Sequence, residues 1–222
     1  MVHHPPSSHL PRSEKKTLDT LVFRNPDVVE AAKNLLGLSL FTHIDGHLTG
    51  GVITETEAYA GVSDKASHAY GGRRTARTEV MYRQGGVAYV YLCYGIHALF
   101  NVVTGESGVP HAVLIRAIQP THSIDIMMQR RRKTRFDRTL ANGPGALAAA
   151  LGITVAYTGT PLDSESLWIA NLGFKINEFE TTPRIGIDYA EECIDLPYRF
   201  VCKNLQEITE PGFSRDAMLR GY

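Results

Sequence analysis

The sequence predicts an α+β fold in a single domain, and three observations lead to this prediction. Strand-like runs and helical stripes follow one another without regular β–α–β alternation, which disfavours a parallel α/β architecture. No internal repeat and no Pro/Gly-rich linker divides the chain. Its 222 residues, 43% hydrophobic and 21% charged, are enough to bury one core of ordinary size.

Residues 1–17 are rich in Pro, Ser and His, a composition that predicts a disordered lead. The single domain is expected to span residues 18–222. The lead lacks the apolar core of a signal peptide, and the longest apolar runs are far shorter than the roughly 20 residues that span a bilayer. We therefore expect a cytoplasmic protein that is neither secreted nor bound to a membrane.

The first helix is expected to begin at Asn25-Pro26, where Asn25 can cap it and Pro26 fits its first position. Gly37 is a typical stop for such a helix. The residues between them carry an apolar stripe that supports the helix: Val28, Val29, Ala32, Leu35 and Leu36.

The rest of the chain is expected to alternate irregularly between strands and two further helices. Residues 38–44 and 47–59 flank Asp45-Gly46, a pair typical of a tight hairpin turn. Two more strands, at residues 87–92 and 99–103, are joined through Tyr94-Gly95. The remaining predicted strands are residues 113–118, 167–170 and 184–187, and the helices are 123–132 and 144–151, the latter ended by Gly152.

Charge is unevenly distributed along the chain, although the formal net charge is zero. Residues 1–138 hold 17 Lys/Arg against 12 Asp/Glu, a difference of +5, and residues 139–222 hold 6 against 11, a difference of −5. This polarity suits a protein that presents a basic face to a polyanion, and an oligomer interface is the alternative explanation.

The cysteines and histidines do not indicate a metal site. Cys93, Cys193 and Cys202 are too few and too scattered for a disulfide framework, so buried thiols are expected. The nine histidines form no HExxH motif and do not combine with the cysteines in a zinc-binding pattern. The sequence therefore predicts neither a metal nor a cofactor.

Residues 54–59 place two carboxylates and a phenol at alternate positions. In a strand, Glu55, Glu57 and Tyr59 share one face, with neighbours roughly 6.5–7 Å apart. Such a face can serve hydrolysis, because a carboxylate can activate water while an aromatic ring orients the substrate. The alternative is a solvated strand face with two surface glutamates.

A glycine- and arginine-rich loop follows at residues 68–86. Gly71-Gly72 lets a ligand approach the backbone closely, and His68 can offer a ring face or a backbone group to a base. Three arginines in this loop suit phosphate contacts: Arg73, Arg74 and Arg77. A mobile basic loop is the alternative. Because no phosphate-loop or dinucleotide fingerprint is present, a nucleoside triphosphate is disfavoured.

Aromatic and polar residues stand out in the predicted central strands. Tyr89 and Tyr91 share a face, and Tyr94 at the hairpin tip can act as a wedge in a base stack, with ordinary strand tyrosines as the alternative. Asn101 and Arg116 interrupt apolar strands, so each is either hydrogen-bonded structurally or lines a site. The basic run at residues 129–138 is either a solvated helix end or a contact to a phosphate backbone.

Taken together, these segments resemble the alkyladenine (3-methyladenine, or methylpurine) DNA glycosylase family. The matches run in the family's order between residues 20 and 202. They comprise Glu55-Thr56-Glu57-Ala58-Tyr59, His68 with Gly71-Gly72-Arg73 and Arg77, Met81, Tyr89-Val90-Tyr91 with Tyr94-Gly95, Asn101, Leu114-Ile115-Arg116-Ala117, Gly143-Pro144, Arg184-Ile185-Gly186-Ile187 and Pro197-Tyr198-Arg199-Phe200.

The resemblance implies a compact α+β domain with a mixed or antiparallel curved sheet, surrounding helices and a protruding β-hairpin that intercalates into DNA. The implied enzyme is a monofunctional DNA-repair glycosylase without lyase activity. It excises 3-methyladenine, 7-methylguanine, hypoxanthine or ethenoadenine from duplex DNA in base excision repair. The implied partner is duplex DNA that contains damaged purines, the protein is a monomer, and its location is the bacterial nucleoid or a eukaryotic nucleus.

The resemblance also implies roles for ten residues. Glu57 is the base for the water that attacks the sugar, and Arg116 helps to hold that water. The residues implied to bind the extruded base are Tyr59, His68, Tyr91 and Asn101, of which Asn101 crowds the guanine amino group. Tyr94 is implied to intercalate, and the DNA-backbone contacts are Arg73, Arg77 and Met81.

The chain departs from the family pattern at Ala146, where relatives commonly carry a lysine after Gly-Pro-Gly. A DNA-backbone contact is then either lost or supplied by residues 129–138. Two other functions stay open. A nucleoside N-ribohydrolase would use a similar pocket but has no use for Tyr94 or the basic loops, whereas a non-catalytic damage-binding module would tolerate loss of Glu57.

Overall fold

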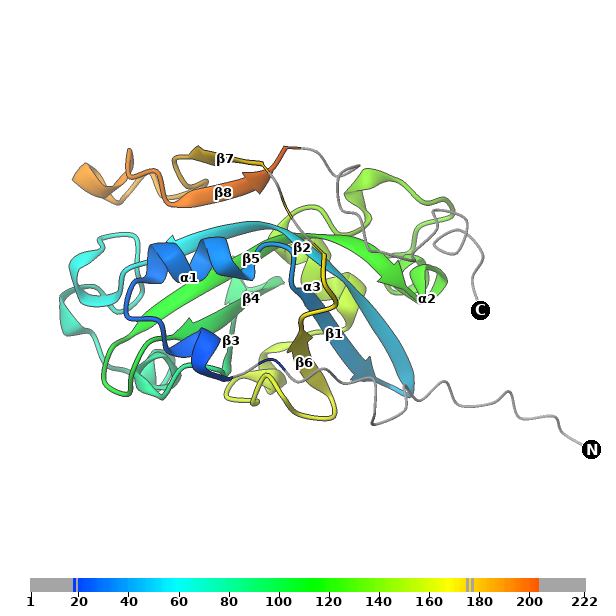
Figure 1. Ribbon diagram of the computed structural model, residues 1–222, viewed down its shortest axis with the longest axis horizontal. Helices are drawn as coiled ribbons and strands as arrows, with labels where there is room; N and C mark the ends of the chain where they lie inside the picture. The colour runs from blue at the N-terminus through cyan, green and yellow to red at the C-terminus, as the bar shows by residue number, and fades with distance from the viewer. Residues whose placement is uncertain (1–17, 19, 175, 177, 204–222) are drawn as a thin grey trace, which may run out of the picture.

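The computed structural model describes residues 18, 20–174, 176 and 178–203, so the predicted lead at residues 1–17 and the segment 204–222 lie outside the described residues. The described residues form one α+β domain built on a curled antiparallel sheet (Figure 1). In chain order its strands are β1 (Ser39–Ile44), β2 (His47–Tyr59), β3 (Ala88–Cys93), β4 (His97–Thr104), β5 (His111–His122), β6 (Leu167–Ala170), β7 (Phe179–Thr182) and β8 (Arg199–Cys202).

Strand β2 organises the sheet, whose order is β3-β4-β5-β2-β1-β6 with β8 also paired to β2 and β7 paired to β8. One edge of β2 pairs with β5, and its other edge pairs first with β1 and then with β8. All these described pairings are antiparallel, which is one of the two arrangements expected. Strands β5 and β8 therefore bring distant parts of the chain to the second half of β2.

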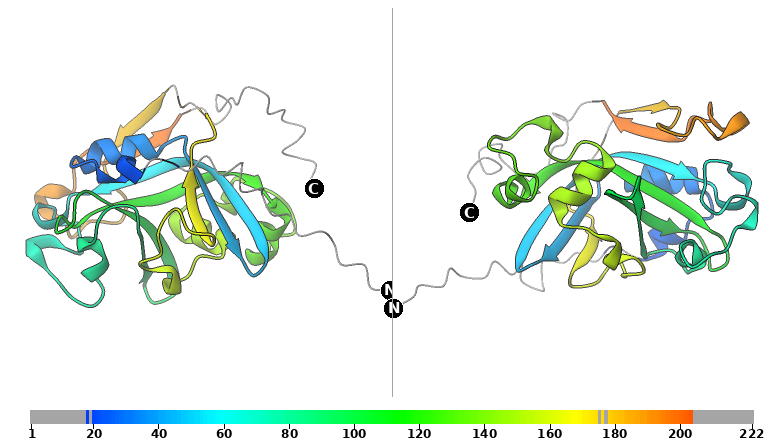
Figure 2. Two further views of the ribbon diagram at one scale, coloured as in Figure 1. Left: turned by 60° about the horizontal axis from the view of Figure 1, so that its bottom comes forward. Right: turned by 180° about the vertical axis from the view of Figure 1, so that it is seen from behind.

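The long strands curl because the β2–β5 register shifts at Gly50/Gly51 and again around Glu55. Such bulges bend a strand and increase its twist, as Figure 2 shows for the central strands. Glycine is required at the first bulge. A Cβ on Gly50 would lie 2.2 Å from the Phe41 ring, and one on Gly51 would lie 2.4 Å from the carbonyl oxygen of Gln119.

Helices cover both faces of the sheet. Helix α1 (Val28–Leu35) lies on one face and α3 (Pro144–Leu151) on the other, with α2 (Ile124–Arg130) at the end of β5 (Figures 1 and 2). As a result β2 is buried along almost its whole length, on both faces. Short 3-10 helices connect these elements: Thr20–Arg24, Gly61–Ser63, Tyr70–Gly72, Glu79–Tyr82, Arg138–Leu140, Val155–Tyr157 and Glu191–Cys193.

Both predicted hairpins are present in the described residues. Asp45 and Gly46 turn with φ values of 55° and 75°, the backbone that a two-residue hairpin needs, and Ile44 pairs with His47. Strands β3 and β4 pair on the two sides of the predicted turn, from Ala88 opposite Val102 to Cys93 opposite His97. The predictions for α3 and β6 are confirmed residue for residue, whereas β5 is six residues longer than expected, 12 instead of 6.

Two predictions were wrong in detail. The cap of α1 is Asp27 rather than Asn25, because the Asp27 carboxylate accepts bonds from the amides of Val29 (2.8 Å) and Glu30 (3.3 Å). Residues 184–187 do not form a strand, since Gly186 has a φ of 74°, which breaks extended backbone. The strands in this part of the chain are β7 and β8, which were not predicted.

Candidate active site

A cavity of about 460 Å³ opens between the end of β2, the β3–β4 hairpin and the start of α3. Seven of the ten predicted site residues line it: Tyr59, His68, Met81, Tyr91, Tyr94, Asn101 and Arg116. The sheet register brings them together, because Tyr89 pairs with Asn101, Asn101 with Leu114, and Leu114 with Glu57. Neighbouring strands thus carry residues from four chain segments into one wall.

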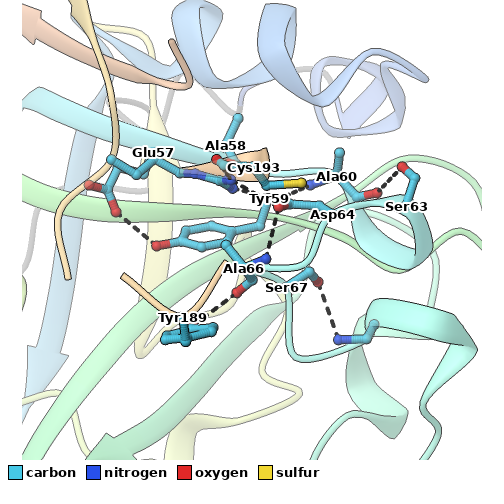
Figure 3. Close-up of polar contacts among 12 residues, drawn as sticks. Glu57, Ala58, Tyr59, Ala60, Ser63, Asp64, Ala66, Ser67, Tyr189 and Cys193 are labelled. Carbon is cyan, nitrogen blue, oxygen red and sulfur yellow. Dashed lines mark hydrogen bonds and ion pairs between the residues drawn. The ribbon is translucent and has the colours of Figure 1, made fainter. Parts of the chain in front are cut away.

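Glu57 lies behind this wall and is 0% exposed. One carboxylate oxygen accepts a 2.8 Å bond from the amide of Ile185 and lies 3.2 Å from Nη1 of Arg116. The other accepts a 2.9 Å bond from the Tyr59 hydroxyl, which points at it in Figure 3. All three partners line the cavity, so the carboxylate is one side chain away from the space a ligand would fill.

Arg116 links Glu57 to a second buried carboxylate, Glu55. Its Nε donates to Glu55 at 2.7 Å, and the same Glu55 oxygen accepts from Nε of Arg199, also at 2.7 Å. Burial opposes the charged guanidinium, but the two carboxylates outweigh it and hold the pKa of Arg116 above its ordinary value. The alternative of a solvated strand face is therefore wrong, since Glu55 is also only 6% exposed.

Three aromatic side chains of the cavity lining contact one another: His68, Tyr89 and Tyr91. The His68 ring meets the Tyr91 ring edge-on at 4.6 Å, and Nδ1 of His68 lies 2.8 Å from the Tyr89 hydroxyl. Burial, then the charges of Arg77 and Arg73, lower the pKa of His68 to about 4, so the ring is neutral at pH 7. Nη2 of Arg77 lies 2.9 Å from Nε2 and 3.3 Å from Nδ1 of this ring.

Asn101 and Tyr59 are both fixed within the wall. The amide nitrogen of Asn101 donates to the carbonyl of Tyr89 at 3.1 Å, and the side chain is 3% exposed. Burial, followed by the nearby charge of Glu57, raises the pKa of the Tyr59 phenol well above its ordinary value. The Asn101 amide and the Tyr59 hydroxyl are thus each held in one orientation by a hydrogen bond.

Tyr94 is 91% exposed at the tip of the β3–β4 hairpin, with a φ of 51°. Leu92 and Ile96 beside it are also exposed, which makes the tip an apolar projection next to the cavity. Large exposed apolar groups of this kind commonly mark a binding surface.

The residues expected to contact a DNA backbone differ from one another. Arg73 and Arg77 are both exposed, and the guanidinium of Arg77 lies 4.9 Å from the centre of the Tyr91 ring. Met81 is only 2% exposed, because it packs with Tyr89 under the cavity, so its side chain is not available for a surface contact. Arg74 pairs with Glu79.

The basic run at residues 129–138 is partly committed to the fold. Arg130 donates to the carbonyl of Ile44 at 2.8 Å and to Thr49 at 3.1 Å, and is thus a structural arginine. Lys133 pairs with Asp137. Arg131 lines the cavity together with Ala146, the position where relatives commonly have lysine.

Sequence reasoning missed three participants. Ile185 contributes a backbone N–H, and Tyr89 supports His68 through its hydroxyl. Arg184 forms a buried ion pair with Asp64 beside Tyr59. The segments that hold these residues, Tyr89-Val90-Tyr91 and Arg184-Ile185-Gly186-Ile187, are among the sequence matches to the family, but none of the three residues was assigned a role from the sequence.

Within the part of the chain that the structure describes, no cluster of three or more His, Cys, Asp or Glu side chains could hold a metal ion. Cys93 and Cys193 there are free thiols, of which Cys193 is buried. None of the described helices is long and apolar enough to cross a membrane.

Comparisons with known proteins show which family the sequence matches. The family model of methylpurine-DNA glycosylase matches residues 22–206. A protein of Chlamydia felis is 54% identical over 181 residues, which cover 81% of this chain and 92% of that protein. Proteins of Desulfitobacterium hafniense (43% over 194 residues, 84% and 96%) and Bacillus thuringiensis (47% over 188 residues, 80% and 92%) are also similar. All three are provisionally named 3-methyladenine DNA glycosylases. The chain belongs to the methylpurine-DNA glycosylase family.

Proposed function

We propose that this DNA glycosylase hydrolyses the N-glycosidic bond of alkylated or deaminated purines in duplex DNA. The substrates we propose are 3-methyladenine, 7-methylguanine, hypoxanthine and ethenoadenine. One observation carries the proposal: the buried carboxylate of Glu57 lies directly behind an aromatic-lined cavity, in contact with three residues that line it.

The cavity suits a base that has been extruded from the DNA duplex rather than one stacked within it. An enzyme cannot reach a glycosidic bond within a stacked duplex, so the nucleotide must rotate out at a cost of a few kcal/mol. Tyr91 and Tyr59 would stack on the extruded purine, which contributes roughly 1–3 kcal/mol. Tyr94, at the apolar hairpin tip, would fill the gap left behind and offset part of the cost.

Glu57 would act as the general base. Water that enters from the cavity would replace one partner of the carboxylate, and Arg116 would hold that water while Glu57 removes its proton. Cationic purines such as 3-methyladenine leave readily, so a single base suffices for them. Neutral hypoxanthine leaves less readily and depends more on protonation of the leaving group.

We further propose a monofunctional enzyme that acts as a monomer on damaged duplex DNA. A lyase step requires an amine nucleophile, and no lysine is among the described residues that line the cavity. Strand breakage should therefore follow only after alkali treatment. Light scattering of the protein bound to a duplex with one lesion tests the stoichiometry.

The deciding experiment measures single-turnover base release from a duplex with one hypoxanthine and from alkylated DNA that contains 3-methyladenine. We expect release by the wild type and none by Glu57→Gln, which should still bind the lesion duplex. Glu30→Gln, an exposed glutamate on α1, is the matched control and should behave as the wild type. Tight binding without release by the wild type would instead indicate a damage-binding module, and activity on free nucleosides alone an N-ribohydrolase.

A further inference from the structure

Arg184 and Asp64 form a fully buried ion pair just outside the cavity wall. Their side chains are 0% and 1% exposed, and they are joined by two bonds, from Nη1 at 2.5 Å and from Nη2 at 2.9 Å. Isolating two charges from water costs several kcal/mol per ion, and a buried pair seldom adds net stability over apolar residues of the same volume. The presence of this buried pair therefore needs an explanation other than the stability of the fold.

The bonds around Arg184 converge on the residues next to Glu57. Nη1 also donates to the carbonyl of Ala58 at 2.8 Å, and the guanidinium lies 4.9 Å from the centre of the Tyr59 ring. Ala58 and Tyr59 directly follow Glu57 in β2 (Figure 3). The guanidinium thus fixes the backbone of Ala58 and the ring of Tyr59 at the end of β2, the strand that carries Glu57.

A second connection runs through the backbone. Ile185, the residue after Arg184, donates its N–H to the Glu57 carboxylate at 2.8 Å. Anchoring Arg184 therefore also places this amide. Since residues 184–187 do not belong to a strand, no sheet hydrogen bonds of their own would hold the amide there.

Asp64 completes the arrangement from the other side. Its two oxygens accept bonds from the amides of Ala60 and Ala66, each at 3.0 Å, and so brace the loop that follows β2 (Figure 3). The carboxylate thereby offers Arg184 a fixed two-oxygen target, which matches the planar guanidinium.

We infer that Arg184, held by Asp64, is a positioning residue for base excision: it sets the Tyr59 ring and the Ile185 amide against the Glu57 carboxylate. This inference rests on the proposed function. Arg184 does not line the cavity, so it acts through its neighbours rather than on the substrate. Its loss should lower the rate of the chemical step far more than the affinity for DNA.

The test compares Arg184→Met and Arg184→Lys with matched variants of Arg130, a partly buried arginine that donates to the backbone carbonyls of Ile44 in β1 and Ala150 in α3. Two quantities are measured: single-turnover base release at saturating enzyme, and affinity for a duplex with a tetrahydrofuran abasic-site mimic. We expect Arg184→Met to release base about 100-fold more slowly, with affinity within about threefold of the wild type, because small misplacements cost rates of this order. Arg184→Lys should release base roughly tenfold faster than Arg184→Met.

Arg130→Met and Arg130→Lys should lose thermal stability but keep the wild-type rate when folded. If Arg184→Met fails to fold by circular dichroism, Arg184→Lys and Asp64→Asn replace it, each with an expected loss of about tenfold in rate at unchanged affinity. Rates equal to those of the Arg130 variants, or affinity that falls in parallel with rate, overturn the positioning role. Wild-type inactivity on every lesion would instead refute the proposed function.

Discussion

Replacing Glu55 by glutamine is expected to weaken both the fold and base release, because one oxygen of this carboxylate binds two arginines. Arg116 and Arg199 each donate to it at 2.7 Å, and the Glu55 side chain is 8% exposed. Removing one partner of a buried ion pair costs about 3–5 kcal/mol, and the amide oxygen of glutamine returns roughly 1–2 kcal/mol by still accepting from one arginine.

The free energy of unfolding should therefore fall by about 2–3 kcal/mol, which lowers Tm by roughly 4–12 °C for a chain of this length. Urea denaturation and single-turnover base release measure the two effects, and we expect release to slow roughly tenfold as Arg116 loses its anchor. Glu79→Gln is the control, because its ion pair with Arg74 is more than half exposed on both sides and solvent screening should leave it little effect on stability. Equal losses in the two variants would refute the assignment of Glu55 as a buried anchor.

Three further predictions concern the cavity. Tyr94→Ala should weaken binding to a damaged duplex roughly tenfold in a gel-shift assay and affect single-stranded substrate less; equal losses would contradict a wedge. Asn101→Ser should raise the release of undamaged guanine, measured by chromatography of free bases, and an unchanged guanine rate would remove its gatekeeping role. His68 titrates near pH 6.5 when unfolded and at about 4 when folded, so protonation favours the unfolded chain between these values. The free energy of unfolding should therefore drop as pH falls from 6.5 toward 4, and less so in His68→Gln; identical pH dependence in both proteins would show that the ring is not buried neutral.

Local patterns in the sequence were sufficient for much of the fold. The Asp45-Gly46 turn, the strands beside it and α3 each depend on residues close in the chain, and these were predicted correctly. The exposed hairpin tip at Tyr94 followed from the turn glycine beside it. Short strands such as β7 and β8 carry little periodicity; β8 forms because β2 offers it a free edge, and β7 then pairs with β8.

The depth of Glu57 could not be predicted, since alternation shows which face a residue takes but not what covers it. Helix α1 and segments more than 120 residues away bury β2 on both faces. The Ile185 amide leaves no trace in the sequence, because every residue except proline has a backbone N–H. Only the register, set by loop lengths and bulges, brings Asn101 and Leu114 into one row with Glu57.

The charges around the cavity bear on how the enzyme would distinguish its lesions. Arg199, Glu55, Arg116 and Glu57 form a row of acidic and basic side chains that alternate in sign, the Arg184–Asp64 pair is balanced in itself, and Arg131 adds one further cation to the cavity lining. The tyrosine rings would attract a cationic purine, and Arg116 in the same wall would repel it.

A pocket in which aromatic rings attract a cation and an arginine repels it should bind a cationic and a neutral lesion about equally well. The leaving ability of each base should then decide the rate of release. We expect Glu57→Gln to bind duplexes with 7-methylguanine and with hypoxanthine within about tenfold of each other, equivalent to about 1.4 kcal/mol. Wild-type release rates, compared after correction for spontaneous depurination, should differ by more than this. Affinities that differ as much as the rates would show that the pocket itself selects charge.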